Sequence, residues 1–198
     1  MTLDAKTYFS HLRAYVNNDY VMYDGTEGEV VLKEKYYSQV SEKQKIRKLK
    51  LLLPGPGLAF QLDLDKRKTK PPLFHFLDDN AKPWSKRCDF VIFYVNRRMF
   101  YADCIEFKSG SIAGNTVKEQ LKAGTRWVMS LKRTIEYYTE DKRKIRMRKF
   151  LFGHMVDASA YLNSDQQLNA DPSIRYYHFD DVQGKHLDCL RNASCEEI

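Results

Sequence analysis

The pattern of apolar and polar positions predicts a mixture of helices and strands. Apolar side chains recur at helical spacing over residues 4–16, which predicts an amphipathic helix. A longer helix is predicted over residues 117–138, where apolar residues recur at alternating steps of four and three. Ser41 and Gln44 form a potential capping box, which predicts a third, basic helix over residues 41–53.

Short apolar runs bounded by turn signals predict the strands. Two of them lie within residues 88–108 and flank a basic turn near Asn96–Arg98, so they form an antiparallel hairpin. Further strands are expected at residues 58–64, 73–77, 149–157 and 174–179. The strand over 73–77 and the hairpin would make a three-strand meander, which the long helix and a parallel strand then follow.

The far ends of the hairpin carry three charged residues. Antiparallel pairing brings these ends together, so Asp89 is expected beside Glu106. Glu106 and Lys108 are two residues apart, so their side chains leave the same face of the strand. Two carboxylates at close range raise each other's pKa and destabilise the fold unless a cation neutralises them. We therefore expect a divalent cation, with the backbone carbonyl of Phe107 as a further ligand.

The chemistry of these groups is that of phosphodiester hydrolysis. Oxygen ligands with positions left for water suit Mg²⁺ or Mn²⁺. A neighbouring lysine can hold the attacking water and offset the charge that develops on a phosphate.

This arrangement resembles the PD-(D/E)xK nuclease superfamily, with Asp89 as the aspartate and Glu106-Phe107-Lys108 as the E-x-K element. The resemblance covers roughly residues 72–156 in the order of elements. It implies a restriction-endonuclease-like α/β core, a mixed central sheet flanked by helices in the order αβββαβ. The chain departs from the pattern at Cys88, where the superfamily has a proline, but that proline takes no part in the chemistry.

The resemblance also implies supporting residues. Gln120, in the first turn of the long helix, is a candidate to hydrogen-bond Lys108 or a water, although a solvent-facing glutamine fits the pattern as well. The superfamily often takes a further glutamate from an N-terminal helix. Glu34 and Glu42 both qualify, and both also fit as exposed helix residues.

The E-x-K triplet alone is weak, because chance gives about one such triplet in a chain of this composition. Glu140-Asp141-Lys142 is a second triplet, and Asp4-Ala5-Lys6 is a similar one at a helix start. Only Glu106 follows an apolar strand and has an aspartate at the matching end of a hairpin.

Composition fits one globular domain that binds an anion. The 198 residues are 43% apolar, enough for one core, and the formal net charge is +7. Residues 117–149 hold eleven Lys/Arg against four acids, and residues 33–50 hold seven against two. We expect a helical N-terminal part to about residue 53 and an acidic, peripheral tail from about residue 184. The basic segments suit a phosphate backbone, although solvated lysine-rich helices are common.

Other classes of site find little support. The four cysteines have no C-x-x-C spacing and the five histidines form no cluster at metal-ligand intervals, so a zinc site is not expected. The N-terminus has no basic start followed by an apolar run, and no apolar stretch approaches the length of a membrane span. We expect a cytoplasmic protein.

The sequence therefore predicts a Mg²⁺-dependent nuclease, with DNA favoured over RNA as its substrate. The resemblance implies a role in restriction, phage defence, recombination or repair, as a homodimer or with a partner protein. The alternatives are an RNA endonuclease and a nucleic-acid-binding or scaffolding subunit without catalytic activity.

Overall fold

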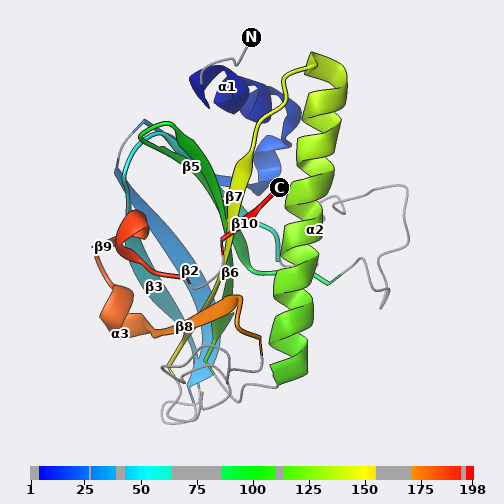
Figure 1. Cartoon of the computed structure of the whole chain (residues 1–198). Coiled ribbons are helices and arrows are strands. Elements are labelled where there is room, and N and C mark those ends of the chain that lie inside the picture. The colour runs from blue at the N-terminus through cyan, green and yellow to red at the C-terminus, as the bar shows by residue number, and fades with distance from the viewer. Residues whose placement is uncertain are drawn as a thin grey trace.

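Three layers make up the fold in the computed structural model (Figure 1). Helices α1 and α2 cover one face of a seven-stranded sheet, and a three-stranded sheet covers the other. The protein is thus mixed α/β, with a mixed sheet and few helices. The structure describes residues 5–26, 28–38, 43–63, 86–109, 114–154, 171–192 and 195–198.

The larger sheet has the strand order β1-β4-β5-β6-β7-β10, and β8 also pairs with β7. Strands β1, β4, β5 and β6 pair antiparallel, whereas β7 is parallel to β6 and β8 is parallel to β7. The predicted hairpin and the parallel strand after the long helix are confirmed. The strands are β1 (Val21–Gly25), β4 (Gly57–Gln61), β5 (Phe90–Asn96), β6 (Met99–Lys108), β7 (Ile145–Gly153), β8 (Ile174–His178) and β10 (Glu196–Glu197).

Helices α1 (Ala5–Tyr15) and α2 (Gly114–Thr139) lie where their apolar spacing predicts them. The buried face of α2 packs on the sheet, and Gly124 permits a close approach. A side chain at Gly124 would overlap the sulfur atoms of Cys88 and Cys104. This contact brings the first turns of α2 against the end of the β5–β6 hairpin.

The smaller sheet consists of β2 (Gly28–Ser38), β3 (Lys43–Leu53) and β9 (Lys185–His186). The basic helix predicted over residues 41–53 is therefore wrong from residue 43 onward. Leu49, Leu51 and Leu53 are buried at every second position, and β3 pairs antiparallel with β2 along its whole length. This pairing prevails over the helical spacing, so the N-terminal part is largely strand rather than helix.

The C-terminal segment is not peripheral, contrary to the sequence-based expectation. Leu187 and Leu190 are buried, and their carbonyl oxygens accept hydrogen bonds from the guanidinium of Arg148 at 3.0 and 2.7 Å. The same guanidinium donates to both carboxylate oxygens of Asp103, at 2.8 and 2.6 Å, and to the hydroxyl of Tyr94 at 2.7 Å. Arg148 thus ties the central strands to the tail. The short helical turns are η1 (Asn18–Tyr20), α3 (Phe179–Val182) and η6 (Leu187–Cys189).

Three strand predictions differ from the structure. The strand predicted over residues 149–157 is β7, which begins earlier, at Ile145, and ends at Gly153, and residues 155–157 lie outside the described residues. The strand predicted over residues 58–64 is β4 and ends at Gln61. The strand predicted over residues 73–77 lies outside the described residues, and β4 is the antiparallel neighbour of β5. Within the described part of the chain, no helix is both long and apolar enough to cross a membrane.

Replacing Arg148 with methionine is expected to destabilise the protein by about 3–5 kcal/mol, because it leaves the buried Asp103 carboxylate without its cation. Urea unfolding measures this change. The neighbouring substitution Arg146→Met is the control. Arg146 makes a surface ion pair with Glu197 and a long hydrogen bond of 3.5 Å to the Tyr101 hydroxyl, so its loss should cost no more than about 1 kcal/mol. Equal losses in the two variants would contradict the assigned role.

Candidate functional site

The register of the β5–β6 hairpin places the charged residues on one face. Phe90 lies opposite Ile105, so Asp89, one residue before the strand, lies opposite Glu106. Cys104, two residues before Glu106, belongs to the core beneath the helices. Side chains alternate along a strand, so Asp89, Glu106 and Lys108 all lie on the helix-facing side.

Lys108 joins the hairpin to α2. Its ammonium donates to Oε1 of Glu106 at 2.5 Å and to Oε1 of Gln120 at 3.1 Å. The hydrogen bond predicted between Gln120 and Lys108 is therefore present. It depends on the close approach of α2, since Gln120 lies one helical turn before Gly124.

Asp89 is held by the backbone of the neighbouring strand. Its Oδ2 accepts a hydrogen bond from the N–H of Phe107 at 2.6 Å. In a strand, the N–H and the C=O of one residue point to the same side. The Phe107 carbonyl therefore faces the same side as its N–H, toward Asp89, the residue before β5. The two carboxylates and the carbonyl expected as ligands thus surround the same end of the hairpin.

Glu34 reaches the site from the smaller sheet. It lies on β2, two residues after the buried Leu32, and its carboxylate accepts a hydrogen bond from Ser109. Burial raises the pKa of Glu34, and the charges of Arg47 and Lys108 lower it. Glu34, on a strand rather than the expected helix, is the glutamate that the structure brings to the site; Glu42 lies outside the described residues.

The carboxylates at this end of the hairpin, the buried one of Glu106 and the half-buried ones of Asp89 and Glu34, all have raised pKa values. The pKa of Glu106 is raised to about 8, chiefly by burial and then by the charge of Asp89, although Lys108 lowers it. Burial also raises the pKa of Asp89 to about 7, against the Phe107 N–H and Lys108, which lower it. Oε2 of Glu106 and Oε2 of Glu34 are both buried, and neither has a hydrogen-bond partner among the described residues. The described protein groups therefore do not satisfy these oxygens.

Asp63 is a further acidic residue at this end of the sheet that the sequence did not single out. Asp63 lies two residues after the end of β4. The residue between them, Leu62, donates its backbone N–H to the Asp89 carbonyl at 2.9 Å. The charge of Asp63 raises the pKa of Asp89. No local motif marks Asp63, because its position depends on the pairing of β4 with β5 across a long stretch of chain.

The other two acidic-x-Lys triplets do not lie beside a second carboxylate at the end of a strand in the described structure. Glu140-Asp141-Lys142 follows the end of α2, and Glu140 has a φ of +57°, so the triplet lies on a turn rather than a strand. Of Asp4-Ala5-Lys6, Asp4 lies outside the described residues and Ala5 begins α1. Among the described residues, only the Glu106 triplet lies on a strand opposite another carboxylate.

Neither a protein-family model, nor a curated protein, nor a solved structure matches this chain. The geometry of the described residues therefore carries the functional argument.

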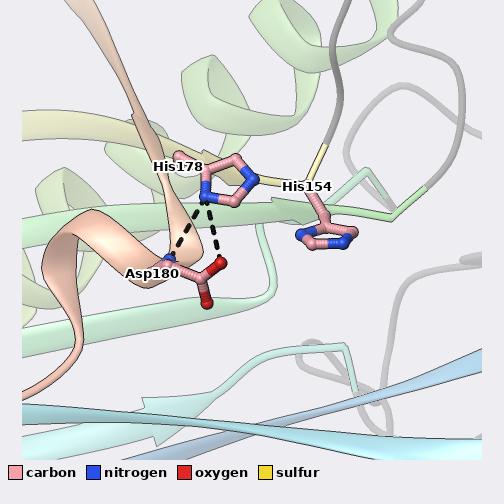
Figure 2. A group of neighbouring side chains, drawn as sticks. All are labelled: His154, His178 and Asp180. Atoms are coloured by element: carbon pink, nitrogen blue, oxygen red, sulfur yellow. Dashed lines mark hydrogen bonds and ion pairs between the residues drawn. The ribbon is translucent and has the colours of Figure 1, made fainter.

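A second group of potential metal ligands was not predicted from the sequence. His154, His178 and Asp180 lie together, and one ligand atom from each falls within 4.8 Å of the others (Figure 2). The histidines have no metal-ligand spacing in the sequence, but His154 follows β7 and His178 ends the neighbouring parallel strand β8, so the fold brings these two together. In the described ranges this is the only group of three or more such residues, so Asp63, Asp89, Glu106 and Glu34 do not converge as closely.

Without divalent ions, Glu106→Gln is expected to stabilise the protein at pH 7 by on the order of 2 kcal/mol. The folded pKa of Glu106, about 8, lies above its ordinary value of 4.5. Between these values the folded chain binds more protons than the unfolded chain, so wild-type stability falls as pH rises from about 4 to about 8. Thermal unfolding across this pH range in a chelator measures the effect.

The control is Glu119→Gln. Glu119 is exposed and its pKa is lowered by Lys86, so this change should give no stabilisation. A Glu106→Gln variant that is less stable than wild type throughout the pH range would show that the Glu106 carboxylate is satisfied without a metal.

Proposed function

We propose that the chain is a metal-dependent phosphodiesterase of the PD-(D/E)xK type, acting as an endonuclease on DNA. The observation that carries the proposal is the pairing of Asp89 with Glu106 on one face, with the Lys108 ammonium 2.5 Å from the Glu106 carboxylate. The order of the elements supports it in part, because β4, β5 and β6 are followed by α2 and β7 as in that fold, while β1, β2 and β3 stand between α1 and β4.

The donor set fits a hard divalent cation. Its atoms are all oxygens, and two of them, on Glu106 and Glu34, are buried with no hydrogen-bond partner in the described part of the chain. Asp89, Glu106 and the Phe107 carbonyl would hold Mg²⁺ or Mn²⁺, and Glu34 is a candidate for a further ligand. Such an ion, when bound, polarises the phosphate and lowers the pKa of a water molecule.

Lys108 would act directly on the reacting groups. Glu106 and Gln120 hold its ammonium at the end of the hairpin, where it can orient a water molecule and offset the charge that grows on the phosphate oxygens. Gln120 is then a positioning residue, since it acts through Lys108.

Basic side chains adjoin the site from both layers. Glu34 pairs with Arg47, and the next two positions on the same face of β2, Tyr36 and Ser38, pair with Lys45 and Lys43. The side chains of Arg47, Lys45 and Lys43 therefore leave β3 on the same face of the smaller sheet as Glu34. On α2, Lys118 and Lys122 are exposed one turn apart, on either side of Gln120 in sequence. Contacts of this kind grip phosphates without regard to base sequence.

The position of the exposed aromatic residues favours duplex DNA over single strands and RNA loops. Proteins that bind unpaired bases stack them on aromatic side chains. The large exposed aromatic residues of the described part are Tyr15, Tyr137 and Tyr138. Tyr138 lies about 27 Å along α2 from Gln120 at the ordinary helical rise, too far to stack a base beside the site.

A binding subunit without catalytic activity is the second candidate. It is favoured by the spacing of the acidic residues, because no three of Asp63, Asp89, Glu106 and Glu34 bring one oxygen each within 4.8 Å of the others in the described structure. Such a protein would bind nucleic acid through the same basic side chains and would not need a metal.

Cleavage of plasmid DNA with Mg²⁺ or Mn²⁺ separates the candidates. Lys108→Ala and Asp89→Asn are each expected to lower the cleavage rate at least about 100-fold, because they remove charge stabilisation and a metal ligand. Lys142→Ala, in the second E-x-K triplet, is the matched control and should cleave like wild type.

Loss of cleavage in both site variants, with retained folding and DNA binding, supports the nuclease. Metal-independent binding by a wild-type protein that cuts neither DNA nor RNA would support the binding subunit. Equal cleavage by the wild type and by the site variants would overturn the assignment of Lys108 and Asp89.

A further inference from the structure

We propose that His154, His178 and Asp180 form a second metal site, which binds Zn²⁺ or a similar divalent transition metal. This site shares no residue with the candidate nuclease site and does not rest on the proposed nuclease function. Its donors are two imidazoles and one carboxylate, a set that suits Zn²⁺ rather than Mg²⁺.

The parallel pairing of β7 and β8 assembles the group. Gly153 at the end of β7 lies opposite His178 at the end of β8, so His154 follows directly beside it. The two imidazole rings lie 5.0 Å apart between centroids and are inclined by 36°. Asp180 lies in the first turn of α3 and returns its carboxylate toward His178 (Figure 2).

The distances are close to those of a zinc site. Zinc–nitrogen and zinc–oxygen bonds of about 2.0–2.1 Å place tetrahedral ligand atoms about 3.3 Å apart. Nδ1 of His178 lies 3.6 Å from Oδ2 of Asp180, and one donor atom of each residue lies within 4.8 Å of the others. His154 and Asp180 are exposed and His178 is half-buried, so small side-chain rotations can close the remaining gap.

The hydrogen bonding is that of a neutral His178. Its Nδ1 accepts a hydrogen bond from the backbone N–H of Asp180 at a long 3.4 Å, so this nitrogen is unprotonated, and a metal bound there would replace that hydrogen bond. Metal ligation by histidine needs the same neutral imidazole. Three protein ligands also leave a fourth position for water, as in open zinc sites.

A metal here would fasten the end of the central sheet. It would join the residue after β7 to the start of α3, just beyond Gly153 and His178, the last pair of the β7–β8 ladder. The His154 N–H also donates to the carbonyl of Lys108 at 3.3 Å. The metal site would therefore hold the chain that lies against the backbone of Lys108.

The test is a titration of the metal-stripped chain with Zn²⁺ alone, followed by calorimetry. Wild type is expected to bind one equivalent at this site. His154→Gln and Asp180→Asn are each expected to lose it or to bind at least about tenfold more weakly, since even residues behind metal ligands change affinity by about 10- to 100-fold. Zn²⁺ should also raise the melting temperature of wild type more than that of these variants.

Two controls match these variants. His186→Gln removes an exposed imidazole outside the group, and Asp181→Asn removes the neighbouring charge in the same turn of α3; both should bind like wild type. Asp89→Asn should also keep the site, which separates this proposal from the nuclease.

Absence of Zn²⁺ binding by wild type, or equal binding by all variants, would overturn the proposal. Co²⁺ absorbance of the wild type gives an independent readout. Bands of a nitrogen and oxygen site are expected, whereas a thiolate charge-transfer band would assign the metal to the exposed Cys189 or Cys195 instead.

Discussion

The register of β5 against β6 is the constraint on which the candidate site depends. A slip by one residue would turn Asp89 to the opposite face of the sheet from Glu106. β5 is buried on both faces, with Val91 and Phe93 beneath the helices and Ile92 and Tyr94 against the smaller sheet. Both faces would have to be repacked for the register to change, so the two hydrophobic cores determine where the carboxylates meet.

The layers on either side complete the site. From the helical side, the contact at Gly124 lets α2 bring Gln120 to Lys108. From the other side, β2 brings Glu34 to the same end of the hairpin. The result is a set of buried and half-buried acidic groups whose removal from water raises their pKa values, a cost in stability that a bound cation would offset.

Local patterns predicted the hairpin and α2, because the apolar runs and helical spacing there allow only one interpretation. They failed for β3, where leucines fit both a helix and a strand, and pairing with β2 decides. The same error left Glu34 as one of two candidates on an expected helix. Contacts between segments that are distant in the sequence bring together His154, His178 and Asp180, and they also bring the tail to Arg148. A short sequence motif does not indicate such contacts.

Soaking a crystal of the protein in Mn²⁺ would locate the metal through its anomalous scattering. A Mn²⁺ ion is expected to be bound by Asp89, Glu106 and the Phe107 carbonyl, with Glu34 beside it. Carboxylates of Asp89 and Glu106 that face different sides of the sheet, or Mn²⁺ found only at His154, His178 and Asp180, would contradict this expectation.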